Sequence, residues 1–224
     1  MLDERLVILK KELMDYAGHV QEMIDKSVRG LLSRKSRMLM EVIEKNELQA
    51  NDWEILLDEH CTNMIAQFQP RARDLRTVLM VFRMNNDLER MADHAVNIAE
   101  NALFLIERPL VKPILDIPRM ADEVRHMVRD SLSSFLNDNA LLARSVCERD
   151  SIVDGLERQI LRELITHMTS DATTIERALH LVDIARNLER IADLSTNMAE
   201  DVIFMVEGRV IKHHKEEQIQ NPNA

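Results

Sequence analysis

One segment of this chain occurs twice, and the two copies lie one hundred positions apart. Residues 87–100 have the sequence DLERMADHAVNIAE, and residues 187–200 have the sequence NLERIADLSTNMAE. A second pair relates residues 47–54 to residues 150–157, at an offset of 103. A repeat with a fixed interval indicates that one structural unit is used twice. The chain is therefore expected to consist of two related halves.

Each half is expected to be helical. The chain has only 4 Gly and 5 Pro, and segments that alternate in the manner of a strand are hard to find. Apolar residues instead recur at steps of three and four, as in Leu6, Leu13 and Val20. Six helices are predicted to begin near residues 3, 36, 73, 118, 138 and 171. Expected capping residues are Ser36, Asn137 or Asp138, and Asp171 at the starts and Gly208 at the last end.

A proline-rich segment separates the two halves. Three of the five prolines lie in residues 109–118, where they remove backbone donors and disfavour helix in the preceding residue. We therefore expect a first three-helix bundle in residues 1–108, a linker in 109–117, a second bundle in 118–208 and a C-terminal tail in 209–224. The predicted fold class is all-α, a tandem repeat of two three-helix bundles with six long helices.

Composition and charge exclude several classes of protein. The net charge of −10 opposes binding to a nucleic acid backbone. No apolar run approaches the roughly 18 residues of a membrane span, and Asp3 and Glu4 stand where a secretory leader would begin. Cys61 and Cys147 are interpreted as reduced packing residues. These features predict a cytoplasmic protein without nucleic acid as a partner.

The repeated segment carries an unusual polar face. Four oxygen-bearing side chains share one stripe of the first copy: Glu89, Asp93, Asn97 and Glu100. At about 100° per residue these side chains lie within about 80° of one another, beside the apolar seam. Carboxylates that repel one another where water is limited are stabilised by a hard or borderline cation. The second half repeats the arrangement with Glu189, Asp193 and Asn197, and Asp150, Asp154 and Glu157 form a similar stripe on the fifth helix.

An ordinary solvated face is the alternative interpretation of these acids. Acidic pairs one turn apart are common on helix surfaces, and Arg90, Arg83 or Arg186 could neutralise them. Duplication also copies residues that have no function. The acids nevertheless stay in register while His94 is replaced by leucine at the equivalent position of the second half. Both interpretations stay open on spacing alone.

Signals for catalysis are weak. Glu123 and His126 have the Glu-x-x-His spacing of di-iron bundles, but such sites need two of these pairs on different helices. No Gly-rich phosphate loop, nucleophile elbow or zinc-spaced Cys or His cluster is found. The chain is therefore not expected to be an enzyme.

Several short segments together resemble the PhoU family. They are LERMAD at residues 88–93 with Asn97, LERIAD at residues 188–193 with Asn197, DLR at residues 74–76, and Glu207 with Gly208. The resemblance extends over nearly the whole chain. It implies tandem three-helix bundles whose Glu/Asp-x-x-x-Asp motifs hold divalent or trivalent metal ions, including multinuclear iron clusters, with zinc, manganese, magnesium and nickel also open.

The resemblance also assigns ligands, residue by residue. The implied metal ligands are Glu47, Glu89, Asp93, Asn97, Asp150, Asp154, Glu189, Asp193 and Asn197. The first half departs from the family pattern at Asn51, where the counterpart of Asp154 has no charge. A site built from Glu47 and Asn51 is therefore expected to bind metal more weakly or not at all.

The function implied by the resemblance is regulatory. Such a protein is a negative regulator of the phosphate starvation response and of phosphate transport. It acts as an adaptor between the ATPase subunit of a phosphate ABC transporter and a sensor histidine kinase, with only peripheral contact with membrane complexes. We expect a homodimer, although helical patterns do not separate intramolecular from intermolecular burial. The alternatives are a carboxylate-bridged metal enzyme, a metal store, or a structural bundle whose acids are solvated.

Overall fold

The computed structural model describes residues 2–208, and the predicted tail with His213 and His214 lies outside them. The elements are α1 (Leu2–Ser33), α2 (Ser36–Glu41), the π-helical turn η1 (Val42–Asn46), α3 (Glu47–Phe68), α4 (Ala72–Ile106), α5 (Asp116–Leu136), α6 (Ala140–Ser170), the 3-10 turn η2 (Ala172–Thr174) and α7 (Ile175–Glu207). The described residues contain no strand. This confirms the all-α class with six long helices, the second of which runs from α2 through η1 to α3.

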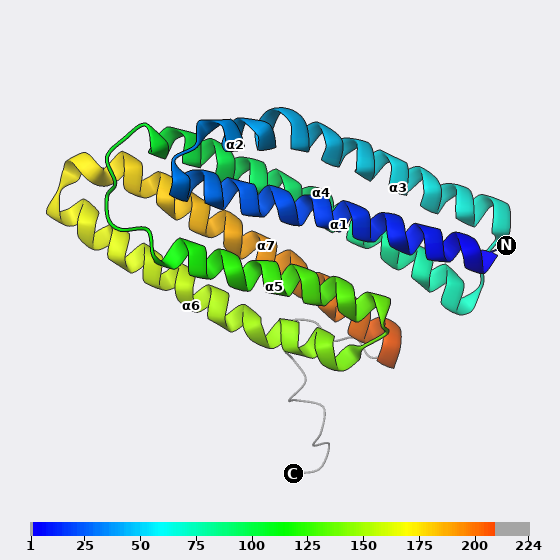
Figure 1. The fold of residues 1–224 in the computed structure, drawn as a ribbon. Coiled ribbons are helices and arrows are strands. Elements are labelled where there is room, and N and C mark those ends of the chain that lie inside the picture. The colour runs from blue at the N-terminus through cyan, green and yellow to red at the C-terminus, as the bar shows by residue number, and fades with distance from the viewer. Residues whose placement is uncertain (1, 209–224) are drawn as a thin grey trace, which may run out of the picture.

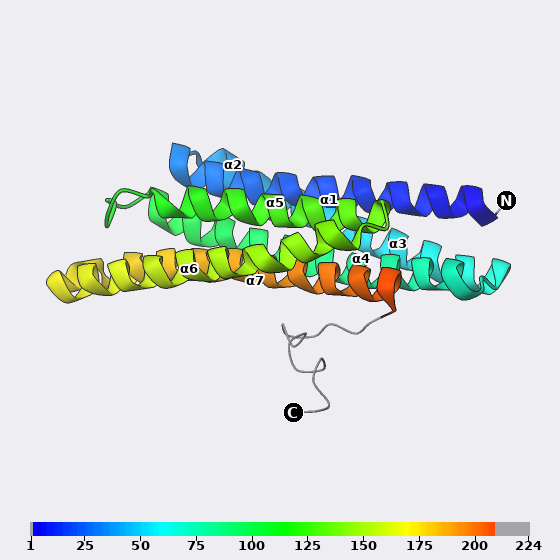
Figure 2. The same ribbon diagram turned by 90° about the horizontal axis from the view of Figure 1, so that it is seen from below.

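The long helices run along a common direction and form two three-helix units side by side (Figures 1 and 2). The first unit contains α1, α3 and α4, and the second contains α5, α6 and α7. The units meet where α4 packs along α7 and α1 packs against α5. Among the described helices, none is both long enough and apolar enough to cross a bilayer.

The core follows the predicted apolar positions. Leu6, Leu13 and Val20 are all buried on one face of α1. The same spacing returns in α5 at an offset of 104: Leu13, Tyr16, Ala17 and Val20 correspond to Ile117, Met120, Ala121 and Val124, and all eight are buried. A single hydrophobic cluster includes residues of both units. The two bundles therefore share one continuous core, and the division into separate domains stays a prediction.

Two of the predicted helix starts are wrong in detail. Ser36 is the first residue of α2, and Lys35 occupies the capping position without a side-chain hydrogen bond. Asn139, and neither Asn137 nor Asp138, caps α6, since its side chain accepts a hydrogen bond from the backbone N–H three residues later at 3.0 Å. A cap needs an extended backbone at that residue, which composition alone does not locate.

The predicted end of the last helix is confirmed, whereas α7 begins at Ile175, one short turn after the predicted capping residue Asp171. The carboxylate of Asp171 accepts a hydrogen bond from the backbone N–H of Thr173 at 2.9 Å and so caps the short turn that leads into α7. Gly208 ends α7 with φ 68°, a left-handed conformation that glycine adopts without strain.

The connection between the units is fixed by polar contacts. The structure places this loop between the end of α4 and the start of α5, and Pro118 lies in the first turn of α5 as expected. Lys112 forms ion pairs with Asp116, at 3.3 Å, and with Glu163 of α6. Arg177 donates a hydrogen bond to the carbonyl oxygen of Pro109 at 2.8 Å. The loop is therefore held against the second bundle.

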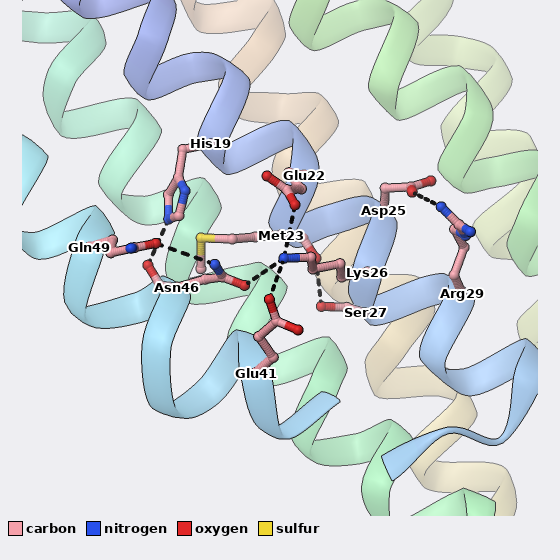
Figure 3. A network of polar contacts seen from close by, with 10 residues as sticks. All are labelled: His19, Glu22, Met23, Asp25, Lys26, Ser27, Arg29, Glu41, Asn46 and Gln49. Carbon is pink, nitrogen blue, oxygen red and sulfur yellow. Dashed lines mark hydrogen bonds and ion pairs between the residues drawn. The ribbon is translucent and has the colours of Figure 1, made fainter. Parts of the chain in front are cut away.

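A polar network on α1 holds the π-helical turn that precedes α3 (Figure 3). Nε2 of His19 lies 2.8 Å from the carbonyl oxygen of Asn46, so this nitrogen carries the proton. Nζ of Lys26 lies 2.9 Å from Glu41 and 2.8 Å from Glu22. A π-helical turn changes the register of the residues that follow it. The network thereby links α1 to the residues that directly precede α3.

Candidate metal centre

In the second half, acids of α6 and α7 face one another. Glu189 and Asp193 lie one turn apart on α7. The pKa of Glu189 is raised to about 7, mainly by burial and next by the charge of Asp193. The charge of Arg190 opposes this rise, whereas Glu157 and Asp154 of α6 add to it. Burial also raises the pKa of Asp193, opposed by Arg190 and helped by Asp154. These four carboxylates form one electrostatically coupled group.

The first half has a similar group between α3 and α4. Burial, then the charges of Asp93 and Glu54, raise the pKa of Glu89. Burial, then Asp58 and Asp93, raise the pKa of Glu54. Glu54 of α3 therefore faces Glu89 and Asp93 of α4 across the bundle. The predicted pair Glu89 and Asp93 is brought together with an acid that the predicted ligand set did not include.

Arginine side chains neutralise only part of this charge. In the second half, Arg190 lies 3.6 Å from Glu189 and 3.4 Å from Asp193, which is the ion pairing that a solvated face would have. The arginines considered earlier pair with other acids: Arg83 with Asp201, Arg90 with Asp87 at 4.0 Å, and Arg186 with Asp183 at 3.7 Å. The charges of the first group therefore have no comparably close arginine among the described ion pairs.

Four of the predicted ligands lie at the margins of these groups. Asn97 is exposed, and Glu47 begins α3 two turns before Glu54. The carboxylate of Asp150 lies 3.4 Å from the hydroxyl of Thr196, one turn before Asp154 on α6. Asn197 lines a hollow of about 400 Å³ with residues of the first half, including Glu54. Asn197 follows Asp193 by one turn of α7, and its role as a ligand stays a prediction.

The repeat in the sequence also indicates Glu54 as a candidate ligand, although the predicted ligand set does not include it. Glu54 and Glu157 occupy equivalent positions at the offset of 103, and each is an acid that lies near the carboxylates of α4 or α7. The Glu157 carboxylate belongs to the predicted stripe of the fifth helix but not to the predicted ligand set.

The donor chemistry of both groups fits a hard or borderline cation, since carboxylate oxygens are the ligands that such ions prefer. A second observation points the same way in the first half. The hydroxyl of Tyr16 is buried near Glu54, Glu89 and Asp93, and it has no hydrogen-bond partner among residues 2–208. Within the same residues, however, no three His, Cys, Asp or Glu side chains are grouped closely enough to hold an ion as they stand. Binding would therefore require the carboxylates to move.

The fold and this site define a class: a tandem three-helix-bundle protein with one coupled group of acids in each bundle. The model of the PhoU domain matches residues 13–102 and again residues 117–202. The chain therefore belongs to the PhoU family.

Similar proteins cover most of the chain. A protein of Aquifex aeolicus named phosphate-specific transport system accessory protein PhoU homolog is 42% identical over 91% of this chain and 92% of its own length. A Pseudomonas putida protein with the same name is 35% identical over 92% of this chain and 80% of its own. The crystal structure of PhoU from Pseudomonas aeruginosa is 32% identical and superposes with a TM-score of 0.89, covering 93% of this chain and all of that one.

Proposed function

We propose that this chain is a non-enzymatic, metal-binding regulator of phosphate homeostasis. It is an accessory protein of a phosphate-specific transport system and a negative regulator of the phosphate starvation response and of the phosphate ABC transporter. It acts in the cytoplasm as an adaptor between the ATPase subunit of the transporter and the sensor histidine kinase. The observation that carries the proposal is the family match in both halves, with relatives named as accessory proteins of this transport system.

The metal part of the proposal is supported by the two coupled groups of acids. Glu54, Glu89 and Asp93 in the first half would hold a divalent or trivalent ion, and Asp154, Glu157, Glu189 and Asp193 would do so in the second. An ion bound there would supply positive charge between helices that otherwise repel one another. In the same proposal the chain forms a homodimer and contacts membrane complexes only at their periphery.

Deletion of the chain tests the regulatory role. In phosphate-rich medium, a reporter of the phosphate starvation response should become active without the chain and silent again when the chain is supplied. A reporter that stays silent after deletion would contradict the proposal.

The adaptor role is tested by recovery of partners from membrane extracts. The full chain should recover the transporter ATPase subunit and the histidine kinase, and recovery with and without chelator tells whether metal is a switch or a structural element. Recovery of neither partner under both conditions would contradict the adaptor role.

Substitution of the paired acids tests metal binding. A chain with Glu89→Gln, Asp93→Asn, Glu189→Gln and Asp193→Asn should lose most bound metal, since amides are weaker ligands for hard cations. Elemental analysis after metal-supplemented purification gives the ratio of metal to chain. The matched control replaces three exposed acids, Glu44, Glu59 and Glu148, by glutamine and should keep the wild-type ratio. Equal metal content in both variants would refute the assignment of these ligands.

The alternative function is a carboxylate-bridged metal enzyme or a metal store. Its sequence signal is the single pair Glu123 and His126 on α5, where Glu123 is half-buried and His126 exposed. The same elemental analysis separates a metal store from the proposed regulator, because a store would hold many ions per chain when iron is supplied.

A further inference from the structure

A buried tyrosine of α1 has no partner for its hydroxyl group. Tyr16 is fully buried, and its ring stacks against Trp53 of α3 with 6.3 Å between ring centroids and 14° between planes. The described residues offer its O–H no hydrogen-bond acceptor in this structure. Buried hydroxyl groups are nearly always hydrogen-bonded, so an orphan of this kind requires an explanation.

Three carboxylates lie within electrostatic range of this donor. Burial, and then the charges of Glu54, Glu89 and Asp93, raise the pKa of Tyr16, so the hydroxyl keeps its proton. These are the three acids that face one another in the first half. Glu54 has the largest electrostatic effect of the three, and it follows directly after Trp53 on α3. The Tyr16 hydroxyl is therefore a buried donor without a partner, within electrostatic range of the acidic group, and its ring stacks on the residue that precedes Glu54.

A second buried polar atom without a partner belongs to Asn85, whose side chain contacts the backbone of Glu54. The amide nitrogen of Asn85 donates to the carbonyl oxygen of Glu54 at 2.9 Å and to the carboxylate of Asp58 at 2.8 Å. Its amide oxygen is buried without a partner among the described residues. The two buried side-chain nitrogen or oxygen atoms that lack partners in residues 2–208 thus both lie near Glu54.

The second half has no such groups. At the offsets of the repeat, Tyr16 corresponds to Met120, Asp58 to Leu161 and Asn85 to Ala185. Met120 and Ala185 are buried apolar residues, and Leu161 packs against the core. The polar side chains around Glu54 therefore have no counterparts in the second half, and the two groups of acids differ chemically.

We propose that Tyr16 is a positioning residue of a first cation site: when Glu54, Glu89 and Asp93 bind a divalent cation, the Tyr16 hydroxyl donates its hydrogen bond to the Glu54 carboxylate and orients it as a ligand. The inference rests on the metal binding of the proposed function. It adds that the two sites are not equivalent. The hydroxyl is an orphan in the metal-free form because its acceptor takes up the required position only with the cation bound.

The test uses the sole tryptophan of the chain. Trp53 lies beside both Tyr16 and Glu54, so its fluorescence reports on the first site. The full chain, freed of metal, is titrated with Mn²⁺ while electron paramagnetic resonance counts the free ion. Tyr16→Phe should weaken the Mn²⁺ affinity reported by Trp53 about tenfold, the usual effect of losing a hydrogen bond to a metal ligand. Met120→Leu, at the equivalent buried position, should leave this affinity unchanged.

A structural role of the hydroxyl predicts a different pattern. Without metal, Tyr16→Phe should unfold at the same temperature as the wild type or higher, because it removes a hydroxyl that has no partner. A lower thermal midpoint for the metal-free variant would overturn the proposal, and so would an unchanged Mn²⁺ affinity. If electron paramagnetic resonance shows that the wild-type chain binds Mn²⁺ but the fluorescence of Trp53 does not change, only the first site is refuted. Wild-type chain that binds no Mn²⁺ would refute the metal-binding part of the proposed function as well.

Discussion

Glu189 has a carboxyl group that holds its proton more tightly in the folded chain than in the unfolded chain. Its folded pKa of about 7 lies above its ordinary value of 4.5 because burial and neighbouring carboxylates disfavour the charge. The folded state therefore binds more protons than the unfolded state between these two values. The contribution of Glu189 to the free energy of unfolding is present below about pH 4.5 and is lost as the pH rises through about 7.

Replacement of this carboxyl group makes the effect measurable. In the presence of chelator, Glu189→Gln should be more stable than the wild type at pH 8 by about 1 to 2 kcal/mol, after allowance for partial solvent screening. At pH 5 the advantage should largely disappear, because the wild-type carboxyl is then protonated in the folded chain. Thermal unfolding at both pH values is the measurement, with exposed Glu148→Gln as control. A constant difference between pH 5 and pH 8 would contradict the assigned shift.

At the scale of elements, α1 contains one glycine that is closely packed, Gly30, and one that has open space around it, Gly18. A Cβ atom added at Gly30 would lie 2.7 Å from Cγ of Leu39, a fully buried residue of α2, whereas one added at Gly18 would meet nothing within 4 Å. Gly30→Ala should destabilise the chain by about 1 to 3 kcal/mol through overpacking. Gly18→Ala should stabilise it by about 0.5 to 1 kcal/mol through helix propensity. Chemical denaturation of both variants checks the pair, and equal effects would show that the contact of α1 with α2 is not tight.

At the scale of the whole molecule, the two bundles should unfold together. α4 packs along α7 as well as within its own bundle, and polar contacts cross this boundary between His94 and Asn187 at 2.8 Å and between His180 and Asn101 at 2.6 Å. Trp53 reports only on the first bundle, while far-ultraviolet circular dichroism reports on all helices. Both signals should give the same thermal midpoint, as a two-state transition requires. A tryptophan transition several degrees away from the other would mean that each half unfolds by itself.

Much of this architecture follows from patterns that are local in the sequence. Steps of three and four between apolar residues predicted the helices and the buried face of α1, and the repeat predicted the two related bundles. Capping was less predictable, because Asn137, Asp138 and Asn139 are all suitable residues and only the backbone angle selects Asn139. The π-helical turn was not predicted at all, since nothing in residues 42–46 interrupts the helical pattern.

The amino-acid sequence by itself determined the helices, their repetition and the alignment of acids along each repeated helix, because these properties depend on spacing within one segment. Only the tertiary structure decided which acids meet across the bundle. It brought Glu54 to Glu89 and Asp93, and it buried the Tyr16 hydroxyl near this group. The physical reason is that contact between helices depends on their rotation and axial shift, which are set by packing and not by the periodicity of either helix alone.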